Sequence, residues 1–122
     1  MDPLYREIIL EHWQNPQNAG VLKNADIDTT EINPLCGDKI RLTIQIEKGK
    51  IKNILFFGVG CAISQASASI FTEEIKGVSL ISIKKITEQD VLVLLGIELT
   101  PARMKCALLI WKTVQKGFTN FQ

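Results

Sequence analysis

The amino-acid sequence predicts an α+β fold in which a pair of antiparallel strands is followed by helices. Residues 40–47 alternate apolar and polar side chains, which is typical of a strand with one buried and one wet face. The turn Lys48-Gly49-Lys50 follows, and the β-branched and aromatic residues of 51–57 indicate that the chain returns as a second strand. Three segments with helical start or stop signals come after it, so strands and helices are segregated along the chain.

Length and composition favour one domain over residues 1–122. The 14 basic and 13 acidic residues are spread along the chain and give a net charge of +1, which argues against nucleic acid as the main partner. The first residues contain no apolar signal core, and no apolar run approaches the ~20 residues that span a bilayer. We therefore expect a cytoplasmic location and no membrane partner. Three cysteines in a reducing compartment favour thiol chemistry or metal binding over a disulfide framework.

The N-terminal part predicts a helix and a short strand. Residues 3–14 indicate the helix, since a proline suits its first position and one face repeats every four residues. That face consists of Leu4, Ile8 and His12. The segment 15–20, rich in Asn, Pro and Gly, ends the helix. Residues 27–32 predict an edge strand, and their polar content does not favour anything longer.

A second helix is predicted after the strand pair, over residues 62–76. It begins beside Cys61 and stops at Gly77, as expected for a glycine C-terminal signal. Its Ala and Ser residues would let it pack close to the sheet. We interpret the serines as packing residues rather than nucleophiles, because no histidine is expected to be available there to activate them.

Two further helices are predicted in the C-terminal third. Residues 87–90 (Thr-Glu-Gln-Asp) resemble a capping box that opens a short helix over 91–95, which Gly96 closes. Thr100-Pro101 begins the last helix, whose apolar residues keep helical spacing as far as Lys116-Gly117.

The segment Asn33-Pro34-Leu35-Cys36-Gly37-Asp38 predicts a turn that carries ligands. Its proline fixes the backbone before Cys36, and Gly37 can take a positive φ, so that the Cys36 sulfur and the Asp38 oxygens can converge. Cys61 lies where a strand meets a helix, a position that favours the thiolate, and Cys106 lies in the early turns of the last helix. Three thiols and Asp38 together match a zinc site, and iron-sulfur clusters are also held by thiolates.

Plainer interpretations stay open for these residues. A cysteine is often simply a small buried side chain, which fits Cys106 best, Cys61 less well and Cys36 least. The wide intervals between the cysteines match no short zinc-finger pattern, so spacing alone does not establish a shared site. His12 fits a packed or capping residue better than a ligand. Arg103 and Lys105 could lower a thiol pKa or meet a persulfide or a partner's carboxylate, or be solvated helix charges.

Three motifs occur in order: the turn at 33–38, Gly-Cys-Ala-Ile-Ser-Gln-Ala-Ser-Ala-Ser at 60–69, and Arg-Met-Lys-Cys-Ala at 103–107. Together they resemble the IscU/SufU/NifU N-terminal family of iron-sulfur cluster assembly proteins, and residues 11–20 resemble the end of that family's first helix. The resemblance covers nearly the whole chain. It implies a three-stranded antiparallel sheet covered by helices, an IscU/SufU-like sandwich with the cysteines at one end.

The resemblance also implies a function. Cys36, Asp38, Cys61 and Cys106 would hold Zn²⁺, iron or a transient [2Fe-2S] cluster. The protein would receive persulfide sulfur from a pyridoxal-phosphate cysteine desulfurase, with Cys36 as acceptor and Arg103 assisting docking or stabilising the persulfide. It would then build a cluster or pass sulfur to downstream iron-sulfur acceptor or scaffold proteins, as a sulfurtransferase partner rather than an independent enzyme.

Three features distinguish the branches of this family. Lys105 stands where IscU-type scaffolds have a histidine, and the Arg103 spacing and the Ala-Ser-Ala-Ser stretch resemble SufU, a sulfur shuttle with tightly bound zinc. SufU proteins usually have an extra segment between the second and third cysteines, which this chain lacks. Residues 99–102 (Leu-Thr-Pro-Ala) replace the proline-rich chaperone motif of IscU. A zinc-dependent shuttle that never holds a cluster, a purely structural zinc domain and a metal-free interaction module are the alternatives.

Overall fold

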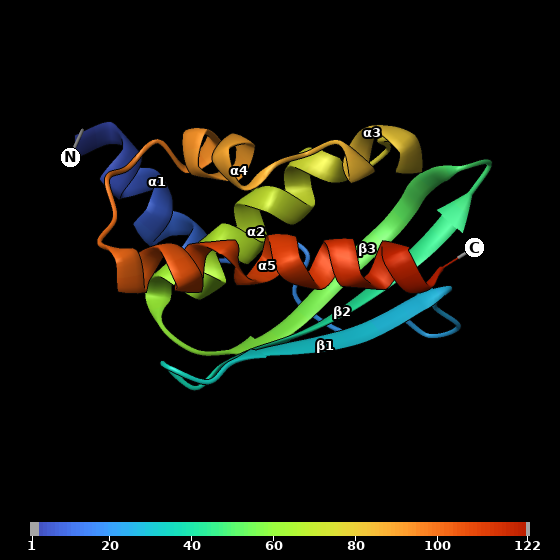
Figure 1. Ribbon diagram of the computed structural model, residues 1–122, viewed down its shortest axis with the longest axis horizontal. Helices are drawn as coiled ribbons and strands as arrows, with labels where there is room; N and C mark the ends of the chain where they lie inside the picture. Colours follow the sequence, from blue (N-terminus) through green and yellow to red (C-terminus); the bar gives the residue numbers. More distant parts are fainter. Residues whose placement is uncertain (1–2, 122) are drawn as a thin grey trace.

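The computed structural model describes residues 3–121, in which helices cover one face of a three-stranded antiparallel sheet with the order β1-β2-β3 (Figure 1). This confirms the α+β class and the sheet implied by the resemblance. No helix within 3–121 combines the length and apolar character that crossing a membrane requires. The elements in chain order are α1 (Pro3–Gln14), β1 (Ile27–Asn33), β2 (Asp38–Glu47), β3 (Lys50–Val59), α2 (Ala62–Ile75), α3 (Leu80–Lys84), α4 (Glu88–Leu95) and α5 (Pro101–Asn120).

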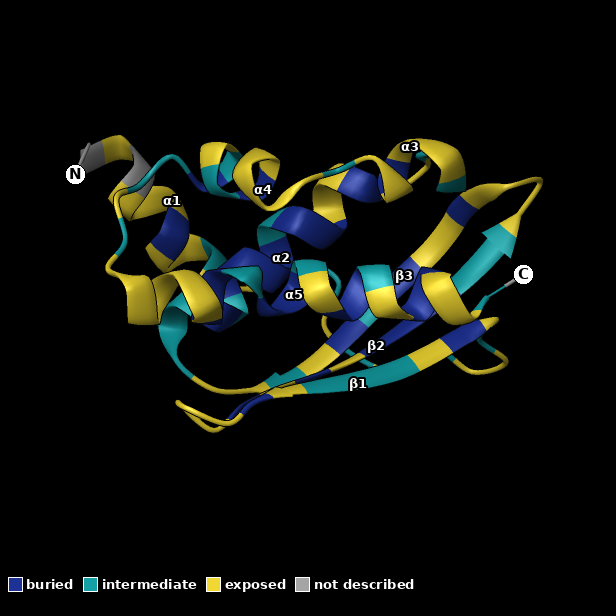
Figure 2. Cartoon of the chain, viewed as in Figure 1, coloured by how far each residue is buried: buried dark blue, intermediate teal, exposed yellow. Residues whose placement is uncertain are grey.

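The core lies between the sheet and the two helices α2 and α5, where Figure 2 shows most of the buried positions. The predicted alternation in β2 is confirmed for Ile40, Leu42 and Ile44, which are fully buried on the helix-facing side. It fails at Thr43, which is buried although it was expected on the wet face, and a register shift between Gln45 and Ile46 interrupts it further on. The three buried apolar residues face Phe71 and Ile75 of α2 and a row of apolar residues on α5. Burying side chains of this size contributes roughly 1.5–3 kcal/mol each, so this layer is the main source of stability.

The small residues of α2, which the sequence analysis expected to face the sheet, also allow a close approach to α5. Ala66, Ser67 and Ala68 are fully buried. The Ser67 hydroxyl donates a hydrogen bond of 2.6 Å to the backbone carbonyl of Ala107 in α5. This hydrogen bond joins the N-terminal halves of α2 and α5.

The last helix does not end at Lys116-Gly117, as the sequence predicted, but continues to Asn120. Gly117 is buried inside the helix, and a Cβ atom there would lie 2.8 Å from Cγ2 of Ile27. Because Gly117 has no side chain, α5 and β1 can come into close contact here. In the sequence alone, a glycine at this position resembles a helix stop signal.

Two other expectations are corrected. The face predicted for α1 is only partly buried: Leu4 and Ile8 are exposed, His12 contacts α2, and Ile9, outside that face, is buried instead. The short helix α3 was not predicted; it begins after Ser79, whose hydroxyl accepts a hydrogen bond from the Ser82 N–H. The capping box of α4 and the Gly96 stop are confirmed.

Candidate metal and thiol site

Three connections of the chain meet at one end of the sheet (Figure 1). They are the β1–β2 loop over residues 34–37, the junction between β3 and α2, and the first turns of α5. Asn33 and Asp38 pair across the base of the loop, so that Asp38 is the first residue of β2 rather than part of the turn as predicted. Gly37 has φ +71°, the positive value expected of it.

Cys36 and Cys106 come into direct contact although they are far apart in sequence. Their sulfur atoms lie 3.4 Å apart. Cys36, Asp38 and Cys106 each offer a ligand atom, and these atoms lie within 4.8 Å of one another. Cys36 is exposed, whereas the side chains of Asp38 and Cys106 are each only 1% exposed. The cluster thus has one thiol open to solvent and a buried interior.

The Asp38 carboxylate is only half satisfied. Its Oδ1 accepts a hydrogen bond of 3.0 Å from the backbone N–H of Cys61. Its Oδ2 is buried and has no N–H or O–H partner within residues 3–121. Gly60 allows this arrangement, since a Cβ atom there would fall on the carboxylate. A buried carboxylate oxygen without a partner is costly, and a cation satisfies it.

Cys61 lies beside this group but is not one of its three members. It is half-buried at the N-cap of α2, and its thiol makes no capping hydrogen bond. Burial raises the pKa of the Cys106 thiol far above its usual value, and contacts with Asp38, Cys36 and Cys61 raise this pKa further. Without a nearby cation Cys106 is therefore a neutral thiol, and a bound cation reverses that preference.

The two charges near Cys106 lie on the exposed side of α5. Arg103 and Lys105 are exposed, and neither forms an ion pair within the described part of the chain. The backbone N–H of Arg103 donates a hydrogen bond to the Thr100 hydroxyl, which confirms Thr100 as the helix cap. Both side chains are free to meet a group that approaches from solvent.

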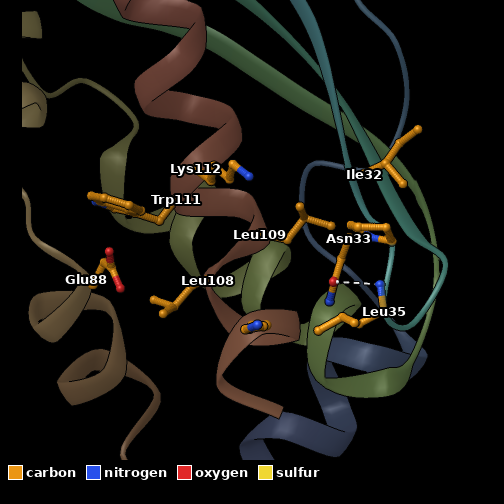
Figure 3. Close-up of a pocket in the computed structure, with 10 residues that line it drawn as sticks. Ile32, Asn33, Leu35, Glu88, Leu108, Leu109, Trp111 and Lys112 are labelled. Carbon is orange, nitrogen blue, oxygen red and sulfur yellow. Dashed lines mark hydrogen bonds between the residues drawn. The ribbon is translucent and has the colours of Figure 1, made fainter. Parts of the chain in front are cut away.

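An apolar groove of about 420 Å³ adjoins the cysteine loop (Figure 3). One wall carries Leu35, the neighbour of Cys36, and the other carries Leu108 and Trp111 of α5. Lys105 and Lys112 lie along the same helix. The groove thus lies beside the loop that carries Cys36, although Cys36 itself does not line it.

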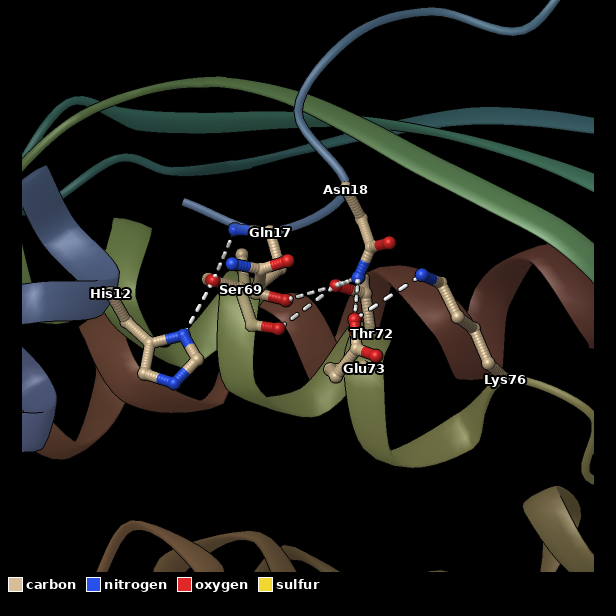
Figure 4. Close-up of polar contacts among 8 residues, drawn as sticks. His12, Gln17, Asn18, Ser69, Thr72, Glu73 and Lys76 are labelled. Atoms are coloured by element: carbon tan, nitrogen blue, oxygen red, sulfur yellow. Dashed lines mark hydrogen bonds and ion pairs between the residues drawn. The ribbon is translucent and has the colours of Figure 1, made fainter. Parts of the chain in front are cut away.

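His12 belongs to a different cluster, as the sequence favoured. Its Nδ1 lies 2.7 Å from the Ser69 hydroxyl, which also accepts the Gln17 backbone N–H at 2.8 Å (Figure 4).

Sequence reasoning missed the buried side chain of Asn33, whose Nδ2 donates to the Cys106 sulfur at 3.8 Å. The only signal was its place at the start of the Asn-Pro turn.

Comparison with known proteins agrees with this arrangement. The chain is 40% identical to the zinc-dependent sulfurtransferase SufU of Bacillus subtilis, over 96% of this chain and 90% of that one. It is 33% identical to the iron-sulfur cluster assembly scaffold protein IscU of Thermotoga maritima, over 93% of this chain and 92% of that one. The SufU alignment runs over 134 positions, so that protein carries residues without a counterpart in these 122.

Solved structures give the same result. A SUF-system protein of Fervidobacterium islandicum AW-1, described as an iron-sulfur cluster assembly scaffold, superposes with a TM-score of 0.79 at 28% identity, over 92% of this chain and 94% of that one. The family model described as NifU-like N terminal domain matches residues 4–122. The chain therefore belongs to the NifU-like N-terminal domain family, which contains the IscU and SufU proteins of iron-sulfur cluster assembly.

Proposed function

We propose that this protein accepts persulfide sulfur from a pyridoxal-phosphate cysteine desulfurase, with Cys36 as the acceptor. The observation that carries the proposal is the contrast between two thiols 3.4 Å apart, an exposed Cys36 and a buried Cys106. The exposed thiol can meet a donor protein, while the buried one stays in the interior. The 40% identity to a zinc-dependent sulfurtransferase supports the same role.

The residues at this site fit a metal ion. Cys36, Asp38, Cys61 and Cys106 would hold it, a donor set of three thiolates and one carboxylate that suits Zn²⁺. The unpaired Asp38 Oδ2 and the closeness of three of the four ligand atoms support this assignment. When bound, Zn²⁺ supplies the positive charge that keeps buried thiols in the thiolate form.

The transfer itself needs no external oxidant or reductant. The Cys36 thiolate attacks the outer sulfur of the donor's persulfide, a bond forms between the two sulfur atoms, and the donor's own S–S bond breaks. The donor cysteine leaves as a thiolate, and Cys36 becomes the persulfide. Its exposed position on a four-residue loop gives the attacking sulfur room to approach the donor.

Arg103 is placed to assist this step. It lies three residues, slightly less than one helical turn, before Cys106 on α5. Its exposed guanidinium would bind a carboxylate of the docking partner or the negative charge of the Cys36 persulfide.

A scaffold role is the second candidate, favoured by the 33% identity to IscU. In that case the same four residues would hold iron or a transient [2Fe-2S] cluster rather than a permanent zinc ion. In both roles the sulfur or cluster passes to a downstream acceptor or scaffold protein. A purely structural zinc domain predicts instead that no desulfurase responds to this protein.

The decisive experiment measures desulfurase turnover of cysteine with and without this protein. We expect Cys36→Ser to abolish the stimulation and the mass gain of one sulfur atom on this chain, because no other exposed thiol is present. Lys84→Ala, an exposed change on α3, serves as the control with unchanged stimulation. Full stimulation by Cys36→Ser would refute the acceptor role.

Metal analysis distinguishes the two candidates. Stoichiometric zinc in the isolated protein, with no absorbing cluster after anaerobic addition of iron and sulfide, supports the sulfur shuttle. A stable cluster under the same conditions supports the scaffold.

A further inference from the structure

Asn33 contacts both the Cys36 loop and the Cys106 sulfur. It is the last residue of β1, pairs with Asp38 across the loop base and is only 6% exposed. Its position therefore depends on the pairing of β1 with β2 rather than on residues 34–37 of the loop. In the function proposed above, Asn33 is not one of the metal ligands.

The oxygen atoms of Asn33 organise the loop that bears Cys36. The side-chain Oδ1 accepts the Leu35 N–H at 3.3 Å, the bond drawn in Figure 3. The backbone carbonyl accepts the Cys36 N–H at 3.3 Å and the Gly37 N–H at 2.8 Å. Three successive N–H groups of the loop thus point at one residue, as in an Asx turn.

The amide nitrogen acts on the other sulfur. Nδ2 donates to Cys106 Sγ at 3.8 Å, and it is the one side-chain N–H that reaches a cysteine sulfur within residues 3–121. A hydrogen bond from a neutral amide stabilises negative charge on sulfur and fixes the direction of its remaining lone pairs. Partners of this kind orient metal ligands and tune their donor strength.

We propose that Asn33 is a positioning residue, which holds Cys106 and the Cys36 loop in register for metal binding and weakens the electron donation of the Cys106 sulfur. The inference rests on the metal site proposed above. It adds a residue that links two ligands from distant parts of the chain through a single side chain.

Two substitutions separate the contacts. In Asn33→Ser the shorter hydroxyl can still accept the Leu35 N–H, but it cannot reach the sulfur, whereas Asn33→Leu removes both contacts. Asn53→Ser is the matched control, because its amide donates to Gln45 on the exposed part of the sheet. Each purified protein is measured for Zn²⁺ affinity by chelator competition, for the sulfur-to-metal absorption band of bound Co²⁺, and for thermal unfolding without metal.

We expect Zn²⁺ affinity to fall by about 10–100-fold in both Asn33 variants. The Co²⁺ band should move to longer wavelength, since the sulfur electrons lose a stabilising hydrogen bond. Asn53→Ser should change neither quantity. A purely structural role would lower the unfolding temperature without moving the band, and Asn33→Ser alone decides the question if the leucine variant does not fold.

The inference is wrong if Asn33→Ser binds Zn²⁺ within about threefold of wild type and leaves the Co²⁺ band unmoved. That result would leave the metal site itself intact. If the wild-type protein binds neither Zn²⁺ nor Co²⁺, then both the metal site and the role of Asn33 are refuted. The wild-type measurement therefore distinguishes the two failures.

Discussion

Two polar clusters lie against α2, and they differ in how completely their groups are paired. Around Ser69, the hydroxyl contacts both His12 and the Gln17 N–H, and Asn18 donates to Thr72 and Glu73 (Figure 4). Around Asp38, one carboxylate oxygen has no N–H or O–H partner within the described residues.

The difference separates a structural cluster from the candidate metal site. The Ser69 cluster ties α1 and the segment after it to α2, and its polar groups are used up in doing so. The Asp38 cluster keeps a buried carboxylate oxygen without an N–H or O–H partner among the described residues, next to the thiols of Cys36 and Cys106. Proteins tolerate such incomplete pairing where it serves a ligand.

Asp38→Asn should have the largest effect, because it completes the pairing of the incomplete cluster. The amide oxygen can still accept the Cys61 N–H, while the new NH₂ group can donate to the thiols. We expect Zn²⁺ affinity to fall by more than about 100-fold, beyond the usual effect of an outer partner. Without metal, the Asp38→Asn variant should be as stable as metal-free wild type, or more stable by about 1–3 kcal/mol. Chelator competition measures the affinity, and urea unfolding measures the stability.

The control for that variant is Asp28→Asn, which removes an exposed carboxylate paired with Arg41. It should leave Zn²⁺ affinity unchanged. A clear loss of metal-free stability in Asp38→Asn would contradict the view that the Asp38 carboxylate is strained without a cation.

Removal of the metal should come next in size. At a free Zn²⁺ concentration of 100 times the dissociation constant, binding stabilises the folded state by about 2.7 kcal/mol. A chelator should therefore lower the unfolding temperature of wild type and of Ser69→Ala by equal amounts. Unequal shifts in calorimetry would show that the two clusters are coupled.

Ser69→Ala should disrupt the cluster around Ser69 and leave the cluster around Asp38 unchanged. It deprives the Gln17 N–H and His12 of a shared partner, which typically costs about 1–3 kcal/mol of unfolding free energy. Zn²⁺ affinity should stay at the wild-type value. Ser82→Ala, on an exposed side chain of α3, is the matched control with little loss of stability in urea.

Glu73→Gln should have the smallest effect, visible only as a change in pH dependence. The hydrogen bond from Asn18, followed by that from Lys76, lowers the pKa of Glu73 below its ordinary 4.5. Its ionised form therefore stabilises the protein above about pH 4.5, and this contribution is lost as pH falls through the lowered pKa. Unfolding temperatures from pH 3 to 7 should show wild type losing its advantage over Glu73→Gln in acid.

Local signals predicted most of the fold. The buried positions Ile40, Leu42 and Ile44, the capping box at Thr87 and the Thr100-Pro101 start each depend on neighbouring residues, and the structure confirms them. The wrong helix end predicted at Gly117 has a non-local cause. This glycine leaves room for Ile27, which is close in space but far away in the sequence. The packed face of α1 was missed for the same reason, since Ile9 meets residues of α2, α4 and α5.

The site was predicted only as a set of residues. The motifs named Cys36, Asp38, Cys61 and Cys106, and the structure brings three of their ligand atoms within 4.8 Å. No spacing rule could show that Asp38 Oδ2 lacks a partner, because that depends on where Gly60 and Cys61 lie. The contact between Asn33 and Cys106 spans 73 positions and has no local signature either.

The separation of Cys36 and Cys106 by 70 positions has a consequence for how the protein matures. Closing so long a loop is among the slower events of folding, and it requires that the sheet and α5 have already docked. A partly folded or misfolded chain therefore presents separate thiols and no binding site. In the function proposed above, a metal ion would therefore be held only by chains in which the whole domain has folded.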